Sequence, residues 1–484
     1  MERRKFLQHT LLTTAGLTLV PVLTKGITLV QSKISPITIS AKSNNTVSLH
    51  HIWSNCIVAA KAKDMLRATW LENLKFVKDN CGFKYVRIWG LCNQNMLIQT
   101  GSDGQYQYHW HLIDDLLDRL LDIGVRPFIE LKLSLKKQGS QDLWSEKIFA
   151  LATHCISRYG AEEVRTWPFE VLKCQSPEEY KFIAERIKSI DSQLKIGFFQ
   201  PSNVSKDSDL TLTMMAGPEV KINDELTGKF EQFLGYCKNN CIPIDFISVK
   251  YDPHENQSTP YRISPLTIKQ ACKKHSFSTT DIHLVFASKI PIRNNKLISS
   301  ASILKANLRD VELPESLSYF SITNIPKKSN PDLCETPELV NYQGIPQQAF
   351  HGYKMLRELG DVILHKEEGV IVTRQSSNGK IIALLYHCPM ETEMNLNKDR
   401  NILLYITDLA PNTSFIIETV DGETQYDGQQ EGKKNLKISS RKEILEIRQV
   451  SRSGRKETYT TDANRVLRFE KAMKPWSSIC IRQV

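Results

Sequence analysis

The sequence has no long apolar runs and no strong excess of charge of one sign. Of its 484 residues, 24% are charged and 41% are hydrophobic. This composition excludes a disordered chain, a collagen-like repeat and a membrane protein with several spans. The 63 basic and 53 acidic residues give a formal net charge of +10. Spread over so long a chain, this surplus does not by itself imply nucleic-acid binding.

Signatures of metal and nucleotide sites are also missing. The eleven cysteines are odd in number and scattered along the chain, which argues against a disulfide framework. Cys237 and Cys241 are four apart, but no second cysteine or histidine pair at zinc spacing accompanies them. No G-x-G-x-x-G follows a predicted strand, so a dinucleotide-binding fold has little support. We therefore expect no metal, no cofactor and at most one or two disulfides.

The first 32 residues have the order of an export signal. Arg3 and Arg4 precede an apolar stretch at 11–23 that is too short for an ordinary membrane span. Paired arginines followed by x-Phe-Leu resemble a twin-arginine signal, which in bacteria carries folded proteins across the plasma membrane. Glu2 replaces the usual Ser or Thr, and no clean cleavage site follows the apolar stretch. We expect a periplasmic or extracellular protein; an uncleaved membrane anchor and a cytosolic amphipathic start are the alternatives.

Strand and helix patterns alternate from about residue 53 to 365. The segments between strands have helical period, as in 111–123, where Leu and Ile recur at intervals of three and four. Eight strand-helix units predict a (β/α)₈ TIM barrel over residues 50–361, with an open doubly wound sheet as the rival. The expected strands are short β-branched or aromatic runs at 56–60, 85–90, 126–131, 167–172, 195–199, 245–251, 283–288 and 318–323.

After residue 361 the pattern changes to short strands with polar turns. This is typical of an antiparallel β-sandwich, expected over 362–484, and the extended segment within 33–49 is expected to add a strand to it. The basic stretch 433–456 is interpreted as a solvated hairpin rather than a polyanion site, because no aromatic residues interleave with its charges. The expected strands lie at 370–374, 381–386, 402–405, 414–418, 444–449, 466–469 and 478–481.

Motifs at the strand ends resemble glycoside hydrolase family 39, the β-xylosidase and α-iduronidase group. The text GFKYVRIWGL at 82–91 is similar to the family's G-F-x-Y-[IV]-R-F-H-G-L. Residues 158–171 closely match the start of R-Y-G-x-x-E-V-R-x-W-x-F-E-V-W-N-E-P-N. Further likeness lies at 113–131, 242–248 and 350–361. The resemblance runs from about 51 to 361, and it implies a TIM barrel that handles carbohydrate.

The same resemblance shows that this chain departs from the family at the catalytic positions. A retaining glycosidase needs two carboxyl groups about 5 to 5.5 Å apart. Here Cys174 occupies the position of the family's acid/base glutamate, and Ala287 occupies that of the nucleophile. The histidine of the second strand is replaced by Trp89, that of the sixth by Lys250, and the tyrosine of the eighth strand matches Tyr319.

Other groups do not obviously supply the missing chemistry. Cys174 is interpreted as inert, since a thiol with a pKa of about 8.5 is a poor acid for a glycosidic oxygen. Glu170 would lie about 13 Å below the strand tip, at roughly 3.3 Å per residue. Glu130 is expected to be a buried, hydrogen-bonded barrel acid, and Trp89 is either core filler or a sugar-stacking surface. The residues expected to bind a substrate are Trp89, Glu130, Glu170, Lys250 and Tyr319.

Three functions remain open. The first is an exported, catalytically degenerate barrel, a pseudoenzyme that binds glycan or a protein partner through the altered cleft. The second is an active xylosidase-like hydrolase that uses relocated carboxylates, for example Asp252 and Glu255 beyond the sixth strand. The third is a structural or envelope protein that binds anionic polymers through a basic sandwich face. Carbohydrate is the expected partner, with no nucleic acid and no integral membrane domain beyond a possible signal anchor.

Overall fold

The chain divides into two compact units, residues 1–35 and 36–484, and the second contains almost all of what is described here. No helix in these described ranges is both long and apolar enough to cross a membrane. The computed structural model describes residues 35–45, 47–101, 107–132, 140–172, 176–199, 220–251, 265–286, 299–309, 314–318, 322–323, 338–389, 398–421, 440–461 and 463–484.

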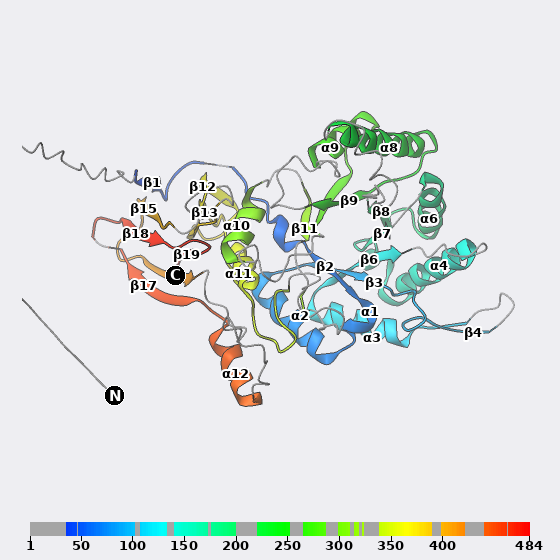
Figure 1. The fold of residues 1–484 in the computed structure, drawn as a ribbon, viewed down its shortest axis with the longest axis horizontal. Coiled ribbons are helices and arrows are strands. Elements are labelled where there is room, and N and C mark those ends of the chain that lie inside the picture. Colours follow the sequence, from blue (N-terminus) through cyan, green and yellow to red (C-terminus); the bar gives the residue numbers. More distant parts are fainter. Residues whose placement is uncertain are drawn as a thin grey trace, which may run out of the picture. The chain divides into compact units, whose positions relative to one another are not determined.

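Eight parallel strands form a nearly closed barrel (Figure 1). The two end strands contact each other, and Asn55 Nδ2 donates a hydrogen bond of 2.6 Å to the carbonyl of Glu315 across the junction. The barrel confirms the predicted fold class and excludes the open doubly wound sheet. In spatial order the strands are β11 (Ser316–Ser318), β10 (Asp281–Phe286), β9 (Phe246–Tyr251), β8 (Lys195–Phe199), β7 (Pro168–Leu172), β6 (Arg126–Lys132), β3 (Tyr85–Trp89) and β2 (Cys56–Lys61).

Helices follow the barrel strands along the chain. Helix α3 shows why: it buries one apolar stripe at Ile113, Leu116, Leu117 and Leu120 and leaves Arg119 and Asp122 exposed. Gly124 ends α3 in the left-handed region at a φ of 77°, where glycine carries no side-chain penalty. The helices of this part are α1 (Ala62–Met65), α2 (Ala68–Cys81), α3 (His111–Ile123), α4 (Ser140–Tyr159), α5 (Ala161–Val164), α6 (Pro177–Ile190), α8 (Val220–Asn239), α9 (Pro265–Lys274), α10 (Ser300–Arg309) and α11 (Gln348–Glu358), with a 3₁₀ turn η1 (Ile52–Ser54) and a hairpin of β4 (Ile98–Thr100) and β5 (Gln107–His109).

Two sheets form a sandwich around a second apolar core, which includes Ile39, Leu404, Phe415 and Ile481. Strand β1 (Ile37–Ser40) pairs in parallel with β15 (Arg400–Thr407), so the segment just before the barrel contributes a strand to the sandwich. The larger sheet has the order β12 (Val362–Glu367), β13 (Val370–Arg374), β14 (Ile381–Tyr386), β19 (Ser478–Gln483), β16 (Ser414–Val420) and β17 (Arg455–Thr460); the smaller has the order β1 (Ile37–Ser40), β15 (Arg400–Thr407) and β18 (Leu467–Met473).

One predicted strand of the sandwich is wrong. Residues 444–449 lie inside helix α12 (Arg441–Val450), so the described part of the basic stretch is a helix followed by β17 and not a hairpin. The Ser440 hydroxyl accepts from the backbone N–H of Glu443, and the Glu443 carboxylate accepts from that of Ser440. This capping box satisfies two donors at the helix start and so stabilises a helix over a run rich in β-branched residues.

An ion pair joins α11 to the sandwich strand β16. Lys354 Nζ lies 2.8 Å from Glu418 Oε1, and the backbone N–H of Gly454 donates to the same oxygen at 3.0 Å. Burial alone would raise the pKa of Glu418, but the hydrogen bond and charge of Lys354 outweigh it, so the pKa is lowered. This carboxylate is therefore ionised and held from both sides.

Candidate functional site

Arg87 occupies the centre of the barrel interior. Its guanidinium donates hydrogen bonds of 2.8 Å to Glu170 on β7 and of 2.8 Å to Ser248 on β9. A longer contact of 3.4 Å reaches Glu130 on β6, and the guanidinium carbon lies 3.9 Å from the centre of the Phe128 ring. Arg87, Glu170 and Ser248 are all fully buried. A planar fork with five N–H donors can hold groups from three strands at once, in a geometry that the compact ammonium of a lysine does not offer.

The strand register explains why a cation is needed at this level. Glu130 pairs in register with Glu170, so two acidic side chains lie side by side on neighbouring strands. The Glu130 side chain is only 10% exposed and that of Glu170 is fully buried. Buried carboxylates are costly unless they are paired and hydrogen-bonded. Both acids are therefore buried, hydrogen-bonded barrel groups, as the sequence predicts for Glu130.

One guanidinium does not fully balance two carboxylates. Burial and the neighbouring Glu170 raise the pKa of Glu130 to about 7, although the charge and hydrogen bond of Arg87 act in the opposite direction. At neutral pH Glu130 is therefore protonated for part of the time.

We expect the substitution Glu130→Gln to change how stability depends on pH. Because the folded-state pKa of Glu130 lies above its ordinary value of 4.5, the folded protein binds more protons than the unfolded chain between pH 4.5 and 7. The wild-type protein thus loses stability from this group as pH rises through that interval, and the glutamine variant does not. The free energy of unfolding of the variant, relative to that of wild type, should therefore rise by about 2 kcal/mol from pH 5 to pH 8. Urea unfolding at both pH values measures this change.

The matched control is Glu72→Gln on the exposed face of α2. Its stability relative to wild type should be the same at the two pH values. If the stability difference between Glu130→Gln and wild type is also the same at pH 5 and pH 8, the pKa of Glu130 is not raised in the folded protein.

Deeper in the barrel, aromatic rings replace charges. Phe128 and Phe246 make an edge contact at 5.2 Å, and His283 packs against each of them at 5.3 Å. Burial, Arg87 and Lys195 hold the pKa of His283 well below its usual range, so the ring is neutral. Gly197 on β8 makes this packing possible, since a Cβ there would come within 2.2 Å of the Phe246 carbonyl oxygen.

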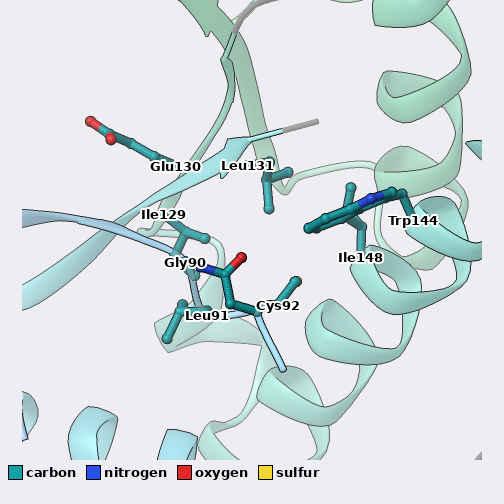
Figure 2. Close-up of a pocket in the computed structure, with 9 residues that line it drawn as sticks. Gly90, Leu91, Cys92, Ile129, Glu130, Leu131, Trp144 and Ile148 are labelled. Atoms are coloured by element: carbon teal, nitrogen blue, oxygen red, sulfur yellow. The ribbon is translucent and has the colours of Figure 1, made fainter. Parts of the chain in front are cut away.

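A small pocket lies behind the barrel wall rather than inside the barrel. It is lined mainly by apolar side chains, among them Leu131, Cys92, Trp144 and Ile148. Figure 2 shows the Glu130 side chain pointing away from this apolar group. The pocket therefore lies between the residues that follow β3, strand β6 and helix α4, on the opposite side of the sheet from the Arg87 network.

The structure brings together some of the predicted site residues and leaves others undescribed. Glu130 and Glu170 meet at Arg87, and Trp89 lies half-buried at the end of β3 with Lys61 Nζ 5.6 Å from its ring centre. Lys250 lies in β9, but its side chain is outside the described residues. That these residues bind a substrate stays a prediction. Also outside the described residues are Cys174, Ala287, Asp252, Glu255 and Tyr319.

Three residues that organise the barrel interior, Arg87, Ser248 and His283, were not predicted from sequence. Arg87 sits between apolar neighbours in a strand whose alternate residues face the same side, and this pattern signals a buried charge. Ser248 and His283 give no such signal, because their roles depend on which strands are neighbours. Within the described ranges no group of three or more His, Cys, Asp or Glu side chains could hold a metal ion.

Comparisons with known proteins agree with this architecture. A β-xylosidase of Geobacillus stearothermophilus is 24% identical over 432 residues, covering 76% of this chain and 80% of that protein. One of Caldicellulosiruptor saccharolyticus is 27% identical over 360 residues, covering 64% and 69%.

Solved structures show the same fold. The family 39 enzyme of Xanthomonas axonopodis pv. citri superposes with a TM-score of 0.71 at 18% identity, over 93% of this chain and 97% of that one. A monomeric β-xylosidase of Caulobacter crescentus gives 0.69 at 18% identity, over 92% and 99%. The sequence profile described as glycosyl hydrolases family 39 matches residues 36–451. The chain therefore belongs to glycosyl hydrolase family 39.

Proposed function

We propose that this chain is an exported family 39 protein that binds carbohydrate at the barrel mouth without the retaining hydrolysis of its relatives. The observation that carries the proposal is the identity of residue 174. Glu170 lies in β7, in register with Glu130 and Gly197, and the family's acid/base glutamate follows four residues later. The residue at that position is Cys174.

The second expected carboxylate is missing as well. Ala287 comes directly after Phe286, the last residue of β10, where the resemblance puts the nucleophile. An alanine side chain has no group that could attack an anomeric carbon. Loss of the general acid alone costs roughly 10²- to 10⁴-fold in rate. Losing both groups argues against turnover by the family's mechanism.

The buried acids are poor replacements. Glu170 is fully buried and has one carboxylate oxygen engaged by Arg87, so it cannot easily reach a bound sugar. Glu130 shares the same cation and is 10% exposed. Withdrawing either from Arg87 would leave a buried charge unpaired, which is costly.

Carbohydrate as the ligand, and export, rest on separate support. The matched relatives are named β-xylosidases, so pentosides and their polymers are the first ligands to test. Export rests on the basic and apolar order of the first 32 residues.

We expect purified protein to bind xylo-oligosaccharides saturably in calorimetry and to release no product from aryl β-xylosides, arabinosides or uronides. The substitution Trp89→Ala should weaken the binding by about two- to tenfold, since an aromatic contact contributes about 0.5 to 1.5 kcal/mol beyond the area it buries. Phe182→Ala, which removes an exposed ring on α6, is the control and should bind as wild type does.

A second function has one specific observation in its favour. Asp252 directly follows Tyr251, the last residue of β9, and so comes just beyond a barrel strand. If wild type hydrolyses a glycoside and Asp252→Asn or Glu255→Gln abolishes that hydrolysis, the assignment as an inactive protein is wrong.

A polyanion site on the sandwich gives a different result. The affinity would then be unchanged in Trp89→Ala but would fall with added salt and in Arg455→Glu, since Arg455 is 78% exposed.

A further inference from the structure

Most of the net charge of the chain comes from one short stretch, residues 433–456. It contains nine basic and two acidic residues and so carries a surplus of seven, against a surplus of ten for all 484 residues. The structure describes this stretch from residue 440 onward, where it forms helix α12 and the first two residues of β17. A surplus concentrated in this way favours an anionic partner.

The described part of this stretch is exposed to solvent. No residue of α12 is buried, and every residue of β17 is exposed. The capping box of Ser440 and Glu443 stabilises the start of the helix without help from a core. The other end is attached to the protein, because Ser451 is fully buried and the Arg448 guanidinium lies against Gly344. The helix is therefore fixed in place while its outer side stays open to a partner.

Acidic residues do not balance this surface. Between residues 440 and 460 there are six basic and three acidic residues. Two of the acids are held by basic neighbours, since Glu446 lies 3.9 Å from Lys442 and Glu457 lies 3.1 Å from Arg455. The third acid is Glu443 of the capping box. A surplus of three positive charges remains after every acid of this segment is counted.

Exposed apolar side chains accompany these charges. Val450 is 66% exposed, more than any other large apolar residue of the described ranges, and Leu445 is 50% exposed. A soluble anionic polymer offers no contact to such side chains, whereas a bilayer accepts them at the boundary between headgroups and acyl chains. A helix of ten residues is about 15 Å long, half the thickness of the hydrocarbon core, so it can lie on a bilayer but not cross it.

We propose that α12 and the start of β17 attach this protein to the surface of an anionic lipid bilayer. The attachment is a second interaction, separate from carbohydrate binding at the barrel mouth and independent of it. Clusters of basic residues on an exposed helix bind anionic headgroups, and each basic residue strengthens the binding by about fivefold. The apolar side chains add a contact that salt does not screen.

The test is sedimentation of the full chain with vesicles of phosphatidylcholine alone or of equal parts phosphatidylcholine and phosphatidylglycerol. Wild type should bind the mixed vesicles and lose affinity as salt is added. Arg441→Gln combined with Lys442→Gln should weaken this binding by about twentyfold, since two charges are removed. Leu445→Ser should weaken it by about fivefold, since the exposed half of the leucine no longer enters the bilayer.

Helix α9 supplies matched controls. Lys269 and Lys273 are exposed one turn apart, and Leu266 is 51% exposed. The double variant Lys269→Gln, Lys273→Gln and the single variant Leu266→Ser should bind the mixed vesicles as wild type does. If they lose as much affinity as the α12 variants, only overall charge and apolar area matter, and the inference is wrong. Thermal unfolding of each variant checks that the fold is intact.

Hydrogen exchange locates the contact, which is needed because the basic and apolar first 32 residues also have features that bind vesicles. In the vesicle-bound protein the amides of α12 should exchange more slowly than in the unbound protein, and those of α9 should not change. Unchanged exchange in α12, or no binding to the mixed vesicles, would overturn the inference and leave the proposed carbohydrate binding untouched.

Polyphosphate tests the rival partner, a soluble anionic polymer. If polyphosphate slows exchange in α12 as much as the vesicles do, and Leu445→Ser binds the vesicles as wild type does, the surface is a polyanion site and the lipid assignment is wrong. Weaker protection by polyphosphate together with the loss in Leu445→Ser supports the bilayer as the partner.

Discussion

Arg87→Met is expected to lower the free energy of unfolding by about 5 kcal/mol at pH 8. Methionine fills much of the arginine volume but provides no hydrogen-bond donor, so Glu170 and Glu130 lose the cation between them. Removing one partner of a fully buried ion pair typically costs 3 to 5 kcal/mol, and here one cation serves two acids and a serine. Urea unfolding of wild type and variant gives the value directly.

Acid should relieve much of this loss. In the variant both carboxyl groups can take up protons, so the difference from wild type should shrink at pH 5. The free energy of unfolding of Arg87→Lys should lie between those of wild type and Arg87→Met, because an ammonium cannot reach both Glu170 and Ser248 with the geometry of the guanidinium fork. Adding Glu170→Gln to Arg87→Met should recover stability. A loss below about 1 kcal/mol at pH 8 would contradict the role given to Arg87.

Lys354→Met is expected to cost about 3 kcal/mol, the lower end of the range for a buried pair, because its side chain is 16% exposed. The change leaves Glu418 with the backbone donor of Gly454 and without a cation. The pKa of Glu418 is lowered in the intact protein, so the stabilisation is present above its ordinary value of 4.5 and is lost as pH falls below it. Chemical unfolding at pH 7 measures the cost.

Two further variants separate the ion pair from general effects. Lys75→Met breaks an exposed pair with Asp79 on α2 and should cost less than about 1 kcal/mol. Lys354→Met combined with Glu418→Leu should be more stable than Lys354→Met alone, since no charge is then stranded. If the double variant is instead less stable, the pair contributes packing rather than charge compensation.

The barrel could be predicted from sequence because its signals are local. Strand β8 and helix α3 have the predicted bounds, since an apolar run or an apolar stripe defines each of them without reference to the rest of the chain. Other barrel strands begin a residue or two away from their predicted starts, as β7 does at Pro168 and β11 at Ser316, because hydrogen-bonded partners and not side-chain type set where a strand begins.

The errors have physical causes. By residue type, Ile444, Leu445 and Ile447 favour a strand, but the capping box at Ser440 and Glu443 begins a helix there. The spacing of these two capping residues is the sequence pattern that indicates the helix. The Arg87 network could not be predicted from sequence for a different reason. Its other members lie 43, 83 and 161 residues from Arg87 in sequence. Only the order and register of the strands bring them together.

The candidate site divides in the same way. The match to the family's sequence motifs was enough to place Glu130 and Glu170 in neighbouring strands and to identify Cys174 and Ala287 as departures from the family. The extra residue of β2 opposite β3, where Ile57 pairs with Val86 and Ala60 with Ile88, could not be predicted from sequence, since such an irregularity leaves no reliable trace in residue type and reverses the alternation of side chains beyond it.

The pairing of β1 with β15 has a consequence for the order of folding. Ile37 is opposite Leu404, so this strand finds its partner only after more than three hundred and sixty further residues have been synthesised. All eight barrel strands lie between the two. We expect the barrel to fold before the sandwich is complete, since contacts between segments that are distant in sequence form late. A chain that is still emerging from the ribosome would therefore carry a folded barrel and an unpaired β1.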